Sequence, residues 1–390
     1  MQRTAGAAST VAMAALLGLL TAILAAGRAQ GQSADAVELH LQAGAERLSR
    51  REFDAAAASF QRAAQLQPAS APAHFGAGLA LANLRKYEQA IAYFKRAIAL
   101  RPDFAGAHLN LGVAQLRLGH DAEAIAALKD AARLSPGLAE AHRTLGTALC
   151  RTGQFGPAIE ACRKAVSLNP KDADAHYCTA WALTRLGRWA EAAGAYRDVI
   201  TLRPSDTQGL LGLGVASSTL GEFDVAIDTL RRLLALEPDS VEGRLALGQT
   251  YANLERWSDA LPHLLRAAEL APGNRGAHYS LGRALARAGR PGDALEHFRE
   301  AVRLDPSDAD AHFRVGLTLV DLHREADAVA SFAAAIRLRP DFAAAVFNLA
   351  LAYHTLGRVD DARAQQQVLA GLDANLARQL RAILDRGAGS

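Results

Sequence analysis

Histidine is the residue type in this chain whose spacing most suggests chemistry. Seven of the twelve histidines recur at one constant step or at a multiple of it: His40, His74, His108, His142, His176, His278 and His312. Such a ladder of imidazoles could ligate metal. However, packed helices lie roughly 10 Å apart, whereas a zinc ion lies about 2 Å from its ligands. Successive histidines cannot share one ion, so we interpret the ladder as structural, with each ring packing between helix hairpins.

Other signatures of catalysis or cofactor binding are weak. The glycine pairs in "GAGLAL" at Gly76 and "GLGVAS" at Gly212 lack the third glycine and the preceding strand of a dinucleotide fingerprint. The sequence has no P-loop, HExxH, GxSxG or N-glycosylation motif. We therefore expect a protein that is not an enzyme and that has no cofactor, no metal and no small-molecule substrate. A catalytic set dispersed over the surface remains an alternative.

The three cysteines, Cys150, Cys162 and Cys178, fit neither a zinc pattern nor a redox CxxC motif. An odd number cannot pair completely. An exported chain that depends on disulfides would more often carry an even set. We interpret these cysteines as small apolar filler and expect no disulfide, although the sequence does not decide whether any of them pair.

The elements that position these residues follow from the prolines. Nine of the thirteen prolines are equally spaced along the chain, at the same step as the histidines: Pro68, Pro102, Pro136, Pro170, Pro204, Pro238, Pro272, Pro306 and Pro340. Because a proline pushes the preceding residue out of the helical region, each one ends a helix. Each interval contains two apolar patterns of helical period. Ten helix hairpins are predicted, starting at Val37, Ala71, Ala105, Ala139, Ala173, Thr207, Val241, Arg275, Ala309 and Ala343.

Small residues mark where the two helices of a hairpin meet. The eighth place of a repeat is glycine in eight repeats and alanine in two, and the twentieth place is always alanine. Glycine within a helix costs about 1 kcal/mol relative to alanine, so we expect the two stripes to meet at close range. Polar residues two places after the proline are predicted N-caps: Asp172, Asp206, Ser240, Asn274 and Asp308. Pro262 is expected to distort its helix only mildly, with Ser258 as the N-cap.

The N-terminus differs from the rest of the chain. Arg3 precedes the uncharged run "VAMAALLGLLTAILAA", and small residues follow at Gly27 to Ala29. Residues 1–29 are therefore predicted to be a signal peptide, so that an exported, periplasmic or secreted chain begins near Gln30. The alternative is a retained membrane anchor over residues 4–27. Residues 30–36 form a polar spacer before the repeats.

Charge excludes one class of partner. The formal net charge is only +3, and acidic and basic residues are interspersed. No basic surface of the nucleic-acid-binding type is implied. We expect a protein or peptide partner and no nucleic acid, with a membrane partner only if the N-terminal segment is retained.

The repeat resembles the tetratricopeptide repeat, whose W-x2-L-G-x2-Y…A-x3-F…P pattern reads here as His74-x2-Ala77-Gly78-x2-Leu81…Ala90-x3-Phe94…Pro102. The period of that family, about 34 residues, is the step that separates the prolines. The resemblance covers residues 37–376. It implies an all-α right-handed superhelical solenoid of about ten helix-turn-helix hairpins. An amphipathic capping helix over residues 372–386 overlaps the last repeat, and residues 387–390 form a tail.

The resemblance also implies a partner-binding groove lined by the first helix of each repeat. Its central residues are expected to be Asn110, Arg117, Arg143, Arg151, Tyr177, Trp181 and Arg185, with Glu140 and Asp174 nearby. The carboxylate-clamp pattern of the family is not reproduced. The favoured function is a non-enzymatic scaffold or adaptor outside the cytoplasm. The alternatives are a membrane-tethered assembly or secretion factor, and an enzyme or enzyme subunit with a site scattered over the groove.

Overall fold

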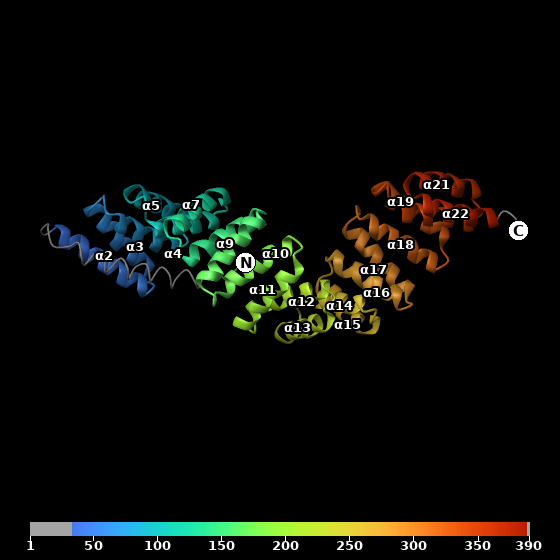
Figure 1. Cartoon of the computed structure of the whole chain (residues 1–390), viewed down its shortest axis with the longest axis horizontal. Coiled ribbons are helices and arrows are strands. Elements are labelled where there is room, and N and C mark those ends of the chain that lie inside the picture. The colour runs from blue at the N-terminus through green and yellow to red at the C-terminus, as the bar shows by residue number, and fades with distance from the viewer. Residues whose placement is uncertain (1–32, 388–390) are drawn as a thin grey trace. The chain divides into compact units, whose positions relative to one another are not determined.

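Helices account for most of the described chain. A computed structural model describes residues 33–387, and within them it contains 21 α-helices and no strand (Figure 1). The predicted all-α solenoid of helix hairpins is therefore confirmed. The predicted signal peptide or anchor, most of the spacer and residues 388–390 lie outside the described residues.

The described residues divide into two compact units, with the boundary between Pro204 and Ser205. The helices of the first unit are α2 (Ser33–Ser49), α3 (Phe53–Leu66), α4 (Ala71–Asn83), α5 (Tyr87–Leu100), α6 (Ala105–Arg117), α7 (Asp121–Leu134), α8 (Ala139–Arg151), α9 (Phe155–Leu168), α10 (Ala173–Arg185) and α11 (Trp189–Leu202). Those of the second unit are α12 (Thr207–Thr219), α13 (Phe223–Leu236), α14 (Val241–Asn253), α15 (Trp257–Leu270), α16 (Arg275–Arg287), α17 (Pro291–Leu304), α18 (Ala309–Asp321), α19 (Glu325–Leu338), α20 (Ala343–Thr355), α21 (Val359–Leu372) and α22 (Ala374–Gly387).

The helices keep the period of the sequence. From α4 to α21, a first helix of 13 residues alternates with a second helix of 14 residues, and each first helix begins at its predicted start. The ends differ. The first helix begins at Ser33, before the predicted Val37, and the last begins at Ala374 rather than at 372. Asp373 causes the second difference, because it is extended and accepts hydrogen bonds from the backbone N–H groups of Asn375 and Leu376.

The predicted N-caps are confirmed. The side chains of Asp172, Asp206, Ser240, Asn274 and Asp308 each accept a hydrogen bond from a backbone N–H in the first turn of the following helix, at 2.9 to 3.2 Å. These bonds satisfy donors that a helix start leaves without a partner. Each of these helices therefore starts at a defined residue after a short connection.

The turn within each hairpin requires a left-handed residue at its fifteenth place. Glycine fills this place in six repeats, for example Gly119 with φ of 79°. Arg51, Arg85, Glu255 and His323 adopt the same conformation with φ between 56° and 64°. A side chain costs roughly 1 to 2 kcal/mol in this region, so these four turns are less favourable than the other six.

The glycine stripe makes room for large side chains of the second helix. A Cβ atom on Gly78 would lie 2.6 Å from Cε1 of Phe94, and one on Gly112 would lie 2.6 Å from Cγ of Leu128. The alanines of the twentieth place are fully buried, but at Gly112 the nearest atom of Ala124 is its carbonyl oxygen, at 3.1 Å. The expectation that two small stripes simply meet is therefore incomplete, because the glycine mainly accommodates the twenty-fourth place.

The histidine ladder forms a repeated hydrogen bond. Nε2 lies 3.0 to 3.2 Å from the carbonyl oxygen of the preceding repeat-end proline at His74, His108, His142, His176, His278 and His312. Since a carbonyl only accepts, Nε2 must carry the hydrogen atom. Arg244, at the same place of its repeat, donates from Nε to the carbonyl of Pro238. These side chains thus fix the loop after seven of the nine repeat-end prolines, which extends the structural interpretation beyond ring packing.

Pro262 leaves its helix continuous, as expected, but the helix starts at a different residue. Helix α15 runs without interruption from Trp257 to Leu270, and its N-cap residue is Arg256. Ser258 is the wrong choice of N-cap, because the hairpin turn places the start of every second helix at the seventeenth place of the repeat. Pro262 consequently lies in the second turn of the helix.

The cysteines contradict the sequence interpretation. Cys162 of α9 and Cys178 of α10 form a disulfide, whereas Cys150 is a buried free thiol. Burial raises the pKa of the Cys150 thiol to about 11. The sequence separation of 16 between the bonded cysteines is uninformative by itself. The two partners come from different repeats and meet only after the hairpins stack.

Candidate functional site

The predicted site residues lie on three first helices of the first unit. Asn110 and Arg117 belong to α6, and Arg143 and Arg151 belong to α8. Tyr177, Trp181 and Arg185 belong to α10. Their surroundings decide which of them can still contact a partner.

The "Trp181 cluster" consists of Trp181, Arg185 and Phe155, and it joins α10 to the start of α9. The Trp181 and Phe155 rings meet edge to face, with their centroids 5.7 Å apart. The guanidinium carbon of Arg185 lies 5.1 Å from the Phe155 centroid and 5.5 Å from the Trp181 centroid. Trp181 is only half-buried and Arg185 is exposed. The cluster therefore combines an ordered arrangement with an accessible aromatic and cationic surface.

Tyr177 lies one helical turn before Trp181 and packs against the next helix. Its ring meets that of Tyr196 on α11 edge to face at 5.9 Å. Tyr196 is buried, and this burial raises its pKa to about 12. Tyr177 is half-buried, so it supports the fold while part of its ring stays accessible.

Arg143 lies among carboxylates. Its Nε is 3.3 Å from an oxygen of Asp172, and its Nη2 is 3.8 Å from Oε1 of Glu140. Burial raises the pKa of Glu140, and its Oε2 atom is buried without a hydrogen-bond partner. Because these carboxylates neutralise Arg143, it does not present a free positive charge to a ligand.

Arg151 links two repeats. Its Nη1 donates to the backbone carbonyl of Leu116 at 3.0 Å, and its Nη2 lies 3.0 Å from Oδ1 of Asp121. Both partners belong to the preceding repeat. The structure thus gives Arg151 a role in stacking, which the sequence could not separate from ligand binding.

The two residues of α6 differ from each other. Asn110 is half-buried and donates from Nδ2 to the carbonyl of Gly106, on its own helix, at 2.8 Å. Arg117 is the last residue of α6 and is exposed. Asn110 therefore has its amide donor occupied within the repeat.

Several of these contacts recur in the second unit and are properties of the repeat. The Asp174–Arg203 pair in the first unit, at 2.7 Å, has its counterpart in Asp310–Arg339, at 2.5 Å. The Tyr177–Tyr196 ring contact has its counterpart in Tyr279–Phe298, at 5.8 Å. Because both partners of each contact lie within one repeat, these contacts belong to the internal packing of the repeat.

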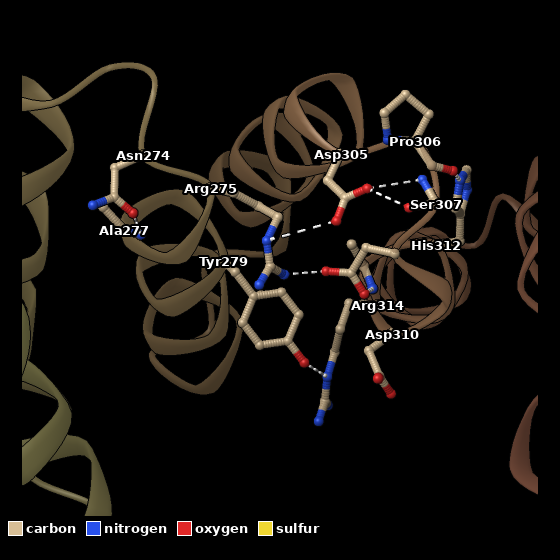
Figure 2. Close-up of polar contacts among 12 residues, drawn as sticks. Asn274, Arg275, Ala277, Tyr279, Asp305, Pro306, Ser307, Asp310, His312 and Arg314 are labelled. Carbon is tan, nitrogen blue, oxygen red and sulfur yellow. Dashed lines mark hydrogen bonds and ion pairs between the residues drawn. The ribbon is translucent and has the colours of Figure 1, made fainter. Parts of the chain in front are cut away.

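Figure 2 shows further polar contacts in the second unit, around the connection between α17 and α18. Arg275 at the start of α16 forms ion pairs with Asp305 and Asp308, which lie in the connection between α17 and α18. The Tyr279 hydroxyl accepts a hydrogen bond from Nε of Arg314, at 3.4 Å. The Arg275 ion pairs lie within one repeat, whereas the Tyr279–Arg314 bond joins adjacent repeats.

The Trp181 cluster has no such counterpart in the sequence of the other repeats. Their ninth place holds Ala45, Leu79, Val113, Thr147, Val215, Gln249, Arg283, Leu317 and Leu351. Trp181 is thus the one aromatic residue at this place. Sequence reasoning identified Trp181 and Arg185 but missed Phe155. A signal was present, because Phe155 occupies the seventeenth place, where Trp189 and Trp257 lie in two other repeats.

Neither a metal cluster nor a membrane span is found in residues 33–387. These residues contain no group of three or more histidine, cysteine, aspartate or glutamate side chains arranged to hold a metal ion. Over the same residues, every helix is too short or too polar to span a bilayer.

Comparison with known proteins identifies the repeat. A tetratricopeptide repeat profile matches residues 41–103, 77–139, 143–207, 211–275, 245–309, 279–329 and 313–377. The chain belongs to the tetratricopeptide repeat family. Tetratricopeptide repeat proteins generally act as scaffolds that bind other proteins or peptides. No curated protein matches the sequence significantly.

Solved tetratricopeptide repeat structures resemble parts or most of the chain. YrrB, described as a protein with an unusual peptide-binding site, is 27% identical with a TM-score of 0.42, covering 48% of this chain and 97% of YrrB. MamA is 27% identical with a TM-score of 0.42, covering 44% and 94%. The structure of the Cut9–Hcn1 hetero-tetramer of the APC/C matches 92% of this chain, and the match covers 90% of the matched chain, with 15% identity and a TM-score of 0.50. This last likeness concerns the fold alone.

Proposed function

We propose that this tetratricopeptide repeat protein is a non-enzymatic scaffold outside the cytoplasm, and that it binds an extended segment or a helix of a partner protein over the Trp181 cluster. The observation that carries the proposal is the half-buried Trp181 ring, which contacts both Phe155 and the exposed Arg185. Tryptophan and arginine dominate binding hot spots, because they bury much area and keep polar reach.

The charges around the cluster support a partner of mixed character. Asp172 and Glu140 neutralise Arg143, Asp121 pairs with Arg151, and Arg203 pairs with Asp174. A strongly acidic ligand would therefore gain little from this surface. A partner segment that presents an aromatic or aliphatic side chain to Trp181, and a hydrogen-bond acceptor to Arg185, fits this surface better than a strongly acidic segment does.

Two observations support a location outside the cytoplasm. The N-terminal sequence has the pattern of a signal peptide, and disulfides such as Cys162–Cys178 persist in oxidising compartments. Mass spectrometry of the native protein tests the location. We expect an N-terminus near Gln30. Met1 or Gln2 at the N-terminus of membrane-bound protein would favour the tethered assembly or secretion factor instead.

A photo-crosslinking amino acid at position 185 tests the binding site. The matched control carries the same amino acid at Arg133, an exposed residue of α7 in the same unit. We expect one partner segment to crosslink at position 185, to be absent at position 133, and to be lost when Trp181→Ala is added. Equal crosslinking at both positions would reject the site. Turnover of a substrate by the purified chain would instead support the enzyme alternative.

A further inference from the structure

The Cys162–Cys178 disulfide occupies a place that a large side chain fills in other repeats. Cys162 is the twenty-fourth residue of its repeat, and its counterparts in every other repeat except the last are Phe60, Phe94, Leu128, Tyr196, Leu230, Leu264, Phe298 and Phe332. All eight of these are buried. A cysteine side chain is smaller than any of them, so it cannot fill this space alone.

The first two repeats show how the same space is filled without sulfur. The Phe60 ring lies against Gly44 of its own repeat and against Gly76 of the next. Gly146 and Cys178 occupy those two places around Cys162. A Cβ atom on Gly146 would lie 3.1 Å from Sγ of Cys178 and would also collide with Sγ of Cys162. The two bonded cysteines thus replace one phenylalanine and one glycine.

The disulfide also joins the two helices that build the Trp181 cluster. Cys162 is on α9, which begins with Phe155, and Cys178 is on α10, between Tyr177 and Trp181. Cys162 is 0% exposed and Cys178 is 7% exposed. Reducing agents therefore reach the bond only when this part of the unit opens.

We propose that oxidation of Cys162 and Cys178 is a maturation step that completes the packing of α9 against α10 and fixes the Trp181 cluster in its binding arrangement. The link to binding rests on the function proposed above, whereas the link to packing does not. In a reducing compartment α9 packs loosely against α10 and the Trp181 cluster is mobile, whereas in an oxidising compartment the disulfide makes both rigid.

The redox step is ordinary thiol–disulfide exchange. An oxidised protein disulfide of the compartment accepts two electrons from the two cysteine thiols, which lose two protons and become bonded. In the reverse direction, a thiolate of a dithiol reductant attacks one sulfur and forms a mixed disulfide. The second thiol of the reductant resolves this intermediate, leaving two cysteine thiols and a cyclic reductant disulfide. After reduction, both sulfur atoms must separate to nonbonded contact inside a filled site.

Thiol mapping and hydrogen exchange test the proposal with the full-length protein. We expect the oxidised chain to have one alkylatable thiol after denaturation, at Cys150, and a mass-spectrometric crosslink between positions 162 and 178. Complete reduction should speed amide exchange of α9 and α10 by roughly tenfold or more, because the cross-link no longer restrains opening. Three free thiols in the exported protein, or unchanged exchange after complete reduction, would overturn it.

A designed variant provides the control. Cys162→Phe combined with Cys178→Gly copies the Phe60 and Gly76 arrangement, and its exchange should be the same with and without reductant. If this variant does not fold, exchange of Cys150→Ala with and without reductant gives the same comparison without thiol shuffling. Because hydrogen exchange uses no partner, failure here is distinct from failure of partner capture.

Discussion

The close approach of helices at the glycine stripe gives the sharpest prediction. In Gly78→Ala, the new Cβ would lie 2.6 and 2.7 Å from Cε1 and Cδ1 of the fully buried Phe94 ring. Overpacking of a core usually costs about 1 to 3 kcal/mol, while the better helix propensity of alanine returns about 1 kcal/mol. Alanine is accepted naturally at this place opposite Tyr196, at Ala180, so the neighbours can adjust. We expect a net loss of up to about 2 kcal/mol.

Gly194→Ala is the matched control, because Gly194 lies within α11 of the same unit and a Cβ there would meet no atom within 4 Å. This variant should gain up to about 1 kcal/mol. Thermal unfolding followed by circular dichroism should show the midpoint falling for Gly78→Ala and rising for Gly194→Ala. Two changes of the same sign would refute the argument that packing, rather than helix propensity, explains the glycine stripe.

Three further predictions concern single residues. Gly146→Leu should destabilise the first unit by several kcal/mol, roughly the scale of severe core changes, and should lower the yield of the disulfide; an unchanged melt would disprove the packing around Cys162. Glu255 has the left-handed conformation, with φ of 57°, which glycine adopts without steric cost. Glu255→Gly should therefore raise the stability of the second unit by about 1 kcal/mol, measured by urea unfolding. A hydrogen bond from Arg203 holds the pKa of Asp174 below its ordinary value. Its carboxylate therefore stabilises the fold above about pH 4, and this contribution disappears as the pH falls through the lowered pKa. The stability difference between wild type and Asp174→Asn should shrink on acidification, and a constant difference would contradict the assignment.

Most of the fold was predictable because the same residue types recur at the same spacing in every repeat. The spacing of Pro68 to Pro340 and the alternation of apolar residues are local signals, and N-caps such as Asp172 and Asp308 follow directly from them. The misplaced N-cap at Ser258 arose because the turn of the hairpin, rather than capping preference, sets the start of α15.

The site was less predictable because its contacts cross from one repeat to the next. The sequence does not rank Arg151, Arg143 and Arg185 as binding residues, since all three are basic residues at expected groove places. Stacking pairs Arg151 with Asp121 and leaves Arg185 exposed over two rings. The Cys162–Cys178 bond has the same origin, because only the packing of α9 against α10 brings the two sulfur atoms together.

The most direct test of the central claim is the affinity of the crosslinked partner segment for Trp181→Ala, measured by titration calorimetry beside a thermal melt. Hot-spot residues typically contribute about 2 kcal/mol or more, which is roughly a thirtyfold loss of affinity. Because Trp181 is half-buried against Phe155, we expect a modest fall in the melting temperature and a folded first unit. Trp257→Ala, which alters the tryptophan at the start of α15 in the second unit, should leave the affinity unchanged. If Trp181→Ala unfolds the first unit or preserves the affinity, Trp181 is a packing residue and the proposed binding surface is wrong.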